Sequence, residues 1–264
     1  MLRRFLVAYV LLVAATVAFG VVGARGAQPS KVQLTITING EGMVAGRGLR
    51  FHCAVAKCTK SFSIPPGPIR LTASPAPTWR FTTWSHVRCR PSTETACTFR
   101  AVRRVTRVSA TFVPPGARLN PIPLGKTAAI GLGWSLTVLS VKPDAVEDVL
   151  GVKGPNGEPI NSPPPAGAQD FMVLVNAIYE GGGKGNPTYL VNNTYAAGSH
   201  NAKYDTQENS CGTWPQPSFQ YAPDVFPGQT LTGNICYQIA TSDASSLMLF
   251  TELHHNRLVW FALH

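Results

Sequence analysis

The chain has 264 residues, a formal net charge of +10, and only 14% charged residues beside 24 Gly and 22 Pro. Soluble chains average about 25% charged residues, and a composition rich in turn formers, Thr and Val favours short strands over long helices. The length suffices for two ordinary domains, and a hydrophobic content of 44% allows packed cores.

The first 27 residues have the three parts of a secretory signal. Arg3 and Arg4 precede an uncharged apolar run over residues 5–22, and small residues follow. Cleavage could follow Ala24 or Gly26. The apolar run has 18 residues, which exceeds a signal core of about 7–15 and approaches the length of a membrane span. The sequence therefore predicts export, either with a cleaved signal peptide or with a membrane anchor.

A first β domain is predicted over residues 31–114. Apolar and polar residues alternate over 32–38, which indicates a half-buried strand, and Gly40–Gly42 supplies the turn to a returning strand. Further strands are predicted at 69–73 and 108–112. The aromatic residues available to fill this small core are Trp79, Phe81 and Trp84.

Charge divides the chain near Pro114. Residues 31–118 have 14 basic and 2 acidic residues, a net charge of +12, whereas residues 119–264 have 6 basic and 11 acidic residues, a net charge of −5. The segment Pro114–Gly116 is a natural end for a strand. The second domain is therefore predicted over residues 119–264.

The second domain reads as a β-sandwich of about seven strands. Its clearest strand is 171–179, where apolar residues alternate over nine positions. The other strands are predicted at 134–141, 230–239, 247–251 and 258–263. A short helix is predicted at 146–152 and a loop at 154–167. The fold class is therefore all-β, with two domains behind the secretion segment.

The cysteines agree with export, because an even number in an oxidising compartment indicates disulfides. They are Cys53, Cys58, Cys89, Cys97, Cys211 and Cys236. Six cysteines allow 15 pairings. Zinc is the alternative for the first four, but gaps of four and seven residues are unlike a zinc knuckle.

The first domain carries an ordered set of short motifs. They are Phe51–Cys53 with Cys58, Ile69–Pro75, Phe81–Trp84, Cys89 with Cys97–Phe99, and Val108–Phe112. This order resembles a divergent internalin B-repeat, a small β module of bacterial surface proteins. Ser85–Arg88 departs from the family, which usually has Gly after the tryptophan. The resemblance implies the pairs Cys53–Cys58 and Cys89–Cys97, an adhesive or spacer role, and no catalytic residues.

The second domain has its own ordered motifs. They are Trp134–Leu139, Gly167–Val175, Cys211–Gly212 and Pro227–Tyr237. The order resembles the immunoglobulin-like sandwich of small secreted actinobacterial antigens and of uncharacterised exported lipoprotein domains. This resemblance implies the pair Cys211–Cys236 and brings no established activity.

The sequence predicts no enzyme, no metal and no cofactor. It lacks a nucleophile elbow and a helical His-Glu-x-x-His pair. Gly181–Gly185 follows a strand without the helix that a phosphate-binding loop needs, so we interpret it as a flexible hairpin loop. Asp205, Glu208 and Asp224 could supply paired carboxylates for glycan hydrolysis, but acids in a polar loop are ordinarily solvated.

Arginines of the first domain form a candidate polyanion-binding patch. They are Arg80, Arg88, Arg90, Arg100, Arg103, Arg104 and Arg107. Outside the cytoplasm such a patch would meet an anionic cell-wall polymer or a membrane surface, and no nucleic acid is expected. Two alternatives stay open: the basic domain docks on the acidic one, or the arginines reflect genomic bias.

The prediction from sequence is a non-catalytic exported protein, of the cell envelope or secreted, whose basic first domain tethers or presents the second. The alternative is an extracytoplasmic module that binds a small molecule or glycan through loops of the second domain. Trp214, Tyr204 and Tyr221 would line that site. The sequence does not identify a protein partner.

Overall fold

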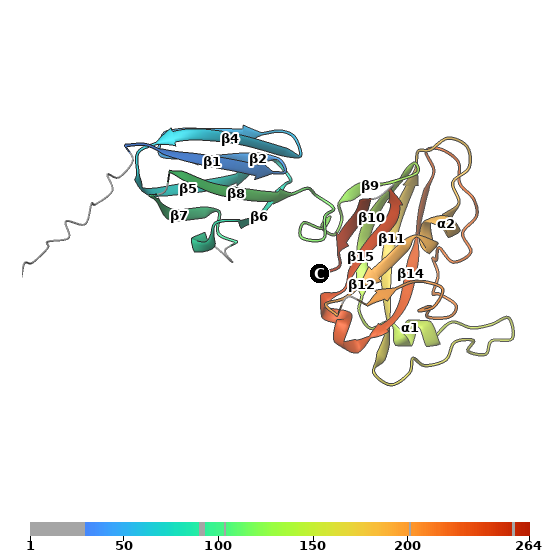
Figure 1. Ribbon diagram of the computed structural model, residues 1–264. Helices are drawn as coiled ribbons and strands as arrows, with labels where there is room; N and C mark the ends of the chain where they lie inside the picture. Colours follow the sequence, from blue (N-terminus) through green and yellow to red (C-terminus); the bar gives the residue numbers. More distant parts are fainter. Residues whose placement is uncertain (1–29, 90–92, 103, 201, 255–256) are drawn as a thin grey trace, which may run out of the picture.

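The computed structural model describes residues 30–89, 93–102, 104–200, 202–254 and 257–264. In these residues sixteen strands form four sheets, so the prediction of an all-β fold is confirmed (Figure 1). The secretion segment, Arg90 and Arg103 lie outside the described residues. Within the described part of the chain, no helix combines the length and apolarity needed to cross a membrane.

Eight strands build a sandwich that we call the first β unit (residues 30–113). They are β1 (Val32–Asn39), β2 (Gly42–Gly46), β3 (Leu49–Cys53), β4 (Lys57–Ile64), β5 (Gly67–Pro75), β6 (Arg80–Trp84), β7 (Ala96–Ala101) and β8 (Val105–Val113). One sheet has the order β4-β1-β8-β6 and the other β3-β2-β5-β7. The pair β1–β8 is parallel and the other pairs are antiparallel.

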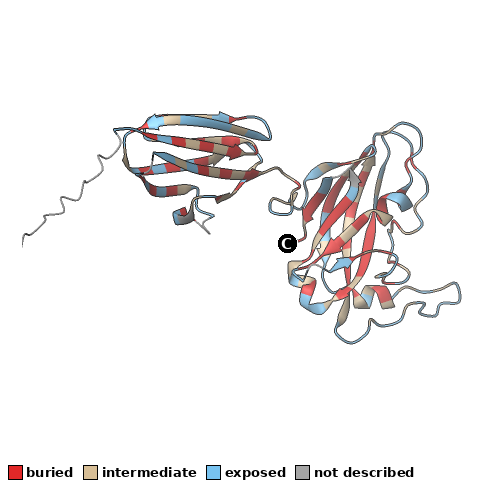
Figure 2. Cartoon of the chain, viewed as in Figure 1, coloured by how far each residue is buried: buried red, intermediate tan, exposed pale blue. Residues whose placement is uncertain are grey.

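Buried and less buried residues alternate along these strands (Figure 2), and the buried ones are apolar side chains that pack between the two sheets. Trp84 is fully buried, and Phe81 packs beside it and against Phe112. Trp79 is partly buried against the same core. The three aromatic residues predicted from the sequence to fill this core therefore do so.

Eight further strands build the second β unit (residues 123–264). They are β9 (Thr127–Gly131), β10 (Trp134–Lys142), β11 (Ala168–Tyr179), β12 (Thr194–Ala197), β13 (Lys203–Tyr204), β14 (Thr230–Ala240), β15 (Met248–His254) and β16 (Arg257–Ala262). The sheets have the orders β14-β11-β10-β9 and β13-β12-β15-β16. Short helical segments accompany these strands, namely α1 (Val146–Leu150), α2 (Pro187–Asn192) and the 3-10 segment η2 (Thr241–Ser246), and the first unit has the 3-10 segment η1 (Val87–Cys89).

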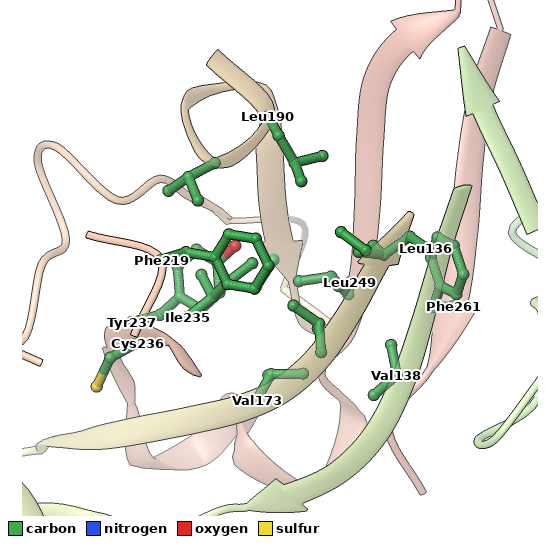
Figure 3. Packing of buried hydrophobic residues seen from close by; sticks show 14 of the residues in the cluster. Leu136, Val138, Val173, Leu190, Phe219, Ile235, Cys236, Tyr237, Leu249 and Phe261 are labelled. Atoms are coloured by element: carbon green, nitrogen blue, oxygen red, sulfur yellow. The ribbon is translucent and has the colours of Figure 1, made fainter. Parts of the chain in front are cut away.

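The core of the second unit lies between its sheets. Figure 3 shows Leu136 and Val173 from one sheet facing Leu249 and Phe261 from the other, and all four are fully buried. Tyr237 is buried with them, and its hydroxyl donates to the backbone oxygen of Thr194. The alternating pattern predicted at 171–179 is the inner and outer face of β11.

Residues 114–122 form a structured linker between the two units. The Trp260 N–H donates to Gly116 O, and the Ile122 N–H donates back to Trp260 O, so the linker extends the edge of β16. On the other side, Asn120 Nδ2 donates to Thr78 O at 2.9 Å and Arg80 Nη1 donates to Leu119 O at 3.1 Å. The linker therefore holds both units through hydrogen bonds.

All six cysteines are paired, as Cys53–Cys58, Cys89–Cys97 and Cys211–Cys236, which are the pairs that the two resemblances imply. The first pair joins the edge strands β3 and β4 across the two sheets, and the second joins η1 to β7 at the opposite edge. The third ties the loop before β14 to that strand. Disulfides persist in oxidising compartments, so the protein is suited to a location outside the cytoplasm.

We predict that the stabilisation by these bridges follows the length of the loop that each one closes. Loss of Cys211–Cys236 in a C211S/C236S variant should lower the free energy of unfolding by about 3.5 kcal/mol, and loss of Cys53–Cys58 in a C53S/C58S variant by about 2 kcal/mol, because the longer loop loses more entropy when closed. Urea denaturation measures both. A larger loss for the short loop would contradict the prediction.

Candidate functional site

The outer face of sheet β3-β2-β5-β7 carries a group of exposed arginines, which we call the basic face (Arg47, Arg50, Arg70 and Arg100). On β5 and β7 the residues on either side of Arg70 and Arg100 are buried, so the pleat sends both arginines outward. The same holds for Arg50 between Leu49 and the partly buried Phe51. None of the four strands contains an Asp or Glu.

Of the seven arginines singled out in the sequence, the five that the structure describes are not brought together on one face. Arg100 lies on the basic face, whereas Arg107 lies on the outer side of the other sheet. Arg80 is at the far end of that second sheet, beside Val113, and Arg88 is in η1. Arg104 occupies the turn between β7 and β8, and Arg90 and Arg103 lie outside the described residues.

Sequence reasoning missed three members of the basic face, Arg47, Arg50 and Arg70. The predicted patch consists mainly of arginines close together in the chain, whereas Arg47 and Arg50 come from the β2–β3 hairpin and Arg70 from β5. The signal that could have found them is their position within alternating strands: Arg50 and Arg70 each lie between residues that face the core.

A second polar cluster lies in the second unit, around the buried carboxylate of Asp243. Asp243 is 1% exposed, and it accepts from the Tyr204 hydroxyl at 2.8 Å. His200 Nδ1 lies 2.6 Å from its other oxygen, and Ser199 Oγ donates to that same oxygen at 3.4 Å. The three side chains tie the segment after β12 to η2.

This arrangement of Ser199, His200 and Asp243 differs from a hydrolytic triad. In a triad the carboxylate holds one imidazole nitrogen and the serine hydroxyl meets the other. Here Ser199 Oγ lies 3.5 Å from Nδ1, the nitrogen that already faces the carboxylate. The serine is therefore on the wrong side of the ring to be activated, and the cluster is explained as a structural anchor.

The environment of Asp243 shifts its ionisation. The hydrogen bond from His200 is the largest effect that holds the pKa of Asp243 below its ordinary value; burial opposes it, and the Tyr204 hydroxyl adds to it. Burial and the same carboxylate together raise the pKa of Tyr204. Asp170 behaves oppositely to Asp243, because burial raises its pKa more than the hydrogen bond from Gln238 lowers it.

The residues predicted to line a loop site in the second unit do not form one. Trp214 is buried, with its indole N–H bonded to Ser210 Oγ, and Tyr204 is buried on Asp243. Tyr221 is 77% exposed. Two of the three residues are therefore part of the core, and the prediction that these three residues line one ligand site is wrong.

Another part of the second unit does contain a hollow, of about 490 Å³, which we call the glycine-loop pocket. Its floor is the Trp134–Tyr179 pair, whose rings are 4.9 Å apart, and its rim includes Leu132, Lys184 and Tyr189. Gly185 lies so close to Tyr179 that an added Cβ would be 2.6 Å from the ring. The 181–185 loop is thus packed over two aromatic residues.

No protein-family model matches the chain, and no curated protein is significantly similar to it in sequence. Solved structures similar to part of it include the secreted protein MPT63 of Mycobacterium tuberculosis, with 13% identity and a TM-score of 0.36 over 53% of this chain and 96% of that one. A β-sandwich protein of Clostridium difficile has 13% identity and a TM-score of 0.35 over 55% and 95%. The yjhA protein of Bacillus subtilis has 10% identity and a TM-score of 0.33 over 54% and 99%.

These similarities are too distant to support an argument about function. The β-sandwich predicted for the second unit is confirmed by its own two packed sheets. The resemblance of residues 31–114 to an internalin B-repeat stays a prediction.

We predict that Asp243→Asn lowers stability most at neutral pH. Because the pKa of Asp243 is lower in the folded than in the unfolded protein, its stabilisation is present above about pH 4 and is lost as the pH falls through the folded value. The variant should lose about 2 kcal/mol at pH 7, as expected for hydrogen bonds to a charged group, and less at pH 3. Thermal unfolding across this pH range measures the difference.

Asp170→Asn provides the control for this pH series. The pKa of Asp170 is raised in the fold, so the contribution of this carboxyl to the stability of the wild type decreases as the pH rises above the unfolded pKa, and the asparagine variant lacks that contribution. The difference in stability between each variant and the wild type should therefore change with pH in opposite directions for the two variants. The same trend in both would contradict the account of the Asp243 anchor.

Proposed function

We propose that this is a non-catalytic exported protein whose first β unit binds anionic polymers of the cell envelope and so holds the second unit there. The observation that carries the proposal is the basic face: four exposed arginines on one side of one sheet, with no acidic residue in its strands. Such a surface attracts polyanions and releases their counterions on binding.

The charge of the whole first unit supports the same proposal. All eleven lysines and arginines that the structure describes between Lys31 and Arg107 are exposed. Among the described residues, hydrogen bonds join the first unit to the linker at Thr78 and at Arg80, two residues outside the basic face. Docking of the second unit on the first therefore does not account for the exposed arginines of the basic face. Binding of an external anion accounts for them.

Export rests on several features that agree. The three disulfides fit an oxidising compartment, and the basic start followed by an apolar run over 5–22 is the pattern of a secretory signal or anchor. An adhesive or spacer role for the first unit is also what its resemblance to an internalin B-repeat would imply.

The proposal predicts strongly salt-dependent binding to anionic polymers. A chain of residues 28–264, which contains both folded units and lacks the apolar run, should bind immobilised long-chain polyphosphate at 20 mM NaCl. Each phosphate contact lowers the slope of log K against log salt by about 0.7–0.9, so a slope of about −3 or steeper is expected for four arginines. Biolayer interferometry measures it. No binding at low salt would remove the proposal.

A second candidate function, binding of a small molecule or glycan, is favoured by the glycine-loop pocket. Tyr189 and Leu132 are exposed on its rim, and aromatic faces stack well on sugar rings. This function predicts that Tyr189→Ala weakens an oligosaccharide interaction about ten-fold, since one well-packed contact contributes about 1.4 kcal/mol. Tyr221→Ala, which removes an exposed tyrosine outside this pocket, is the control. Isothermal titration calorimetry with the glycan gives the affinity, and equal effects of the two variants would contradict a site here.

A further inference from the structure

We propose that Arg47, Arg70 and Arg100 form a clasp for phosphate groups, and that the basic face binds a linear phosphate-bearing polymer in preference to a membrane. This inference rests on the proposed function of the first unit, and it names the ligand class and the residues that recognise it.

The pairing of β5 with β7 sets two members of the clasp side by side. Pro68 and Arg100 are directly opposite each other across the two strands, and Arg70 is two residues further along β5 on the same face. Neighbouring strands are about 4.8 Å apart, and alternate residues of one strand are about 6.8 Å apart. Long side chains from these two positions therefore reach a common point above the sheet.

The third member, Arg47, reaches the same point from the hairpin that joins β2 to β3. Its Nη1 donates to Pro68 O at 3.0 Å, which places the guanidinium over β5 at the residue opposite Arg100. That one bond leaves the other guanidinium N–H groups available, because the group carries five donors. The Arg47 guanidinium thus lies at the Pro68–Arg100 pair, within reach of the long side chains of Arg70 and Arg100.

Arg47 is held in an unusual backbone conformation. It has φ +39° and is followed by Gly48 with φ +77°, so the two-residue hairpin has positive φ at both central positions. Asn, Asp or Gly normally occupies the first of these positions, because a larger side chain is strained there. Strained backbone conformations cluster at functional sites, so the strain at Arg47 supports a role for its side chain. Here that side chain completes the clasp.

The residue before Arg47 permits this approach. Gly46 lies against β5, where a Cβ atom would be 2.2 Å from the backbone oxygen of Arg70. Only glycine lets the hairpin come this close, and the closeness brings Arg47 within reach of Pro68 O. The position of the hairpin and the position of Arg47 in the clasp therefore both depend on the close contact between Gly46 and β5.

Three guanidinium groups within reach of one another select the shape of the anion. A carboxylate offers two oxygens whose lone pairs lie in one plane, which matches the planar fork of one guanidinium. A phosphate within a polymer chain also has two non-bridging oxygens, but they are arranged tetrahedrally around phosphorus, so N–H groups of several arginines can approach them from different directions. The geometry therefore favours phosphate over carboxylate as the repeating anionic group.

The wider face favours a chain-like ligand over a membrane. Arg50 is opposite Ala45, and Ala45 is opposite Thr72, so Arg50, Arg70 and Arg100 follow a diagonal across the sheet of about 20 Å. Membrane-surface binders add large apolar side chains to their basic residues. The exposed large apolar residues described in the first unit are Val55, Val102 and Val105, and none belongs to a strand of this sheet.

The test compares two variants of residues 28–264 that each lose three arginine charges. The clasp variant is R47N/R70Q/R100Q, in which asparagine suits the turn at position 47 and protects the fold. The control variant is R88Q/R104Q/R107Q, which alters exposed arginines elsewhere in the unit. The clasp variant should bind long-chain polyphosphate about ten-fold or more weakly, with a salt slope smaller by about two, and the control variant within about three-fold of the wild type.

A charge-preserving variant, R47K/R70K/R100K, separates recognition by the guanidinium groups of the clasp from the electrostatic attraction of any basic surface for a polyanion. Lysine keeps the charge but lacks the fork, so this variant should keep the salt slope and lose the preference for polyphosphate over a polycarboxylate of equal charge. If the wild type binds polyphosphate but the clasp and control variants bind it equally weakly, the inference of a clasp is wrong and the proposed function stands. Tighter binding to anionic vesicles of 30% phosphatidylserine than to polyphosphate would overturn the polymer assignment. If the wild type binds neither ligand, both proposals fail.

Discussion

The first β unit is organised by the need to fill the narrow space between its two sheets with apolar side chains. Alternating residues of each strand turn inward to meet this need, and the charged residues between them have only the outer faces left to occupy. The result is a basic face whose arginines come from distant parts of the chain. Their common orientation is a consequence of core packing, and the proposed binding function uses it.

The covalent bridges and the linker preserve this arrangement. Cys53–Cys58 and Cys89–Cys97 close opposite edges of the first sandwich, which otherwise has a small core, and Cys211–Cys236 fastens a loop to the edge strand β14. The linker is itself hydrogen-bonded to β16, and Arg118 stacks over Trp260. Under the proposed function, the first unit binds an envelope polymer and the linker keeps the second unit attached to it.

Strand periodicity made much of the fold predictable, and β1, β5, β8, β10, β11, β14, β15 and β16 all overlap predicted strands. The short strand β13, with two residues, is too short to show a period, and β12 lies in a run of small and polar residues. The basic face was less predictable. Arg100 was singled out, but the approach of Arg47 to Pro68 depends on strand order and on a close hairpin contact, neither of which local sequence encodes.

The central claim is that the outer face of sheet β3-β2-β5-β7 is the surface that binds an anionic polymer. Titration of the ¹⁵N-labelled protein with polyphosphate, followed by backbone amide chemical shifts, tests it most directly. The account predicts that the largest changes lie in β3, β5, β7 and the turn at Arg47, while β1, β4 and the second unit change little. Changes centred on the outer side of β4-β1-β8-β6, or on the glycine-loop pocket, would contradict it.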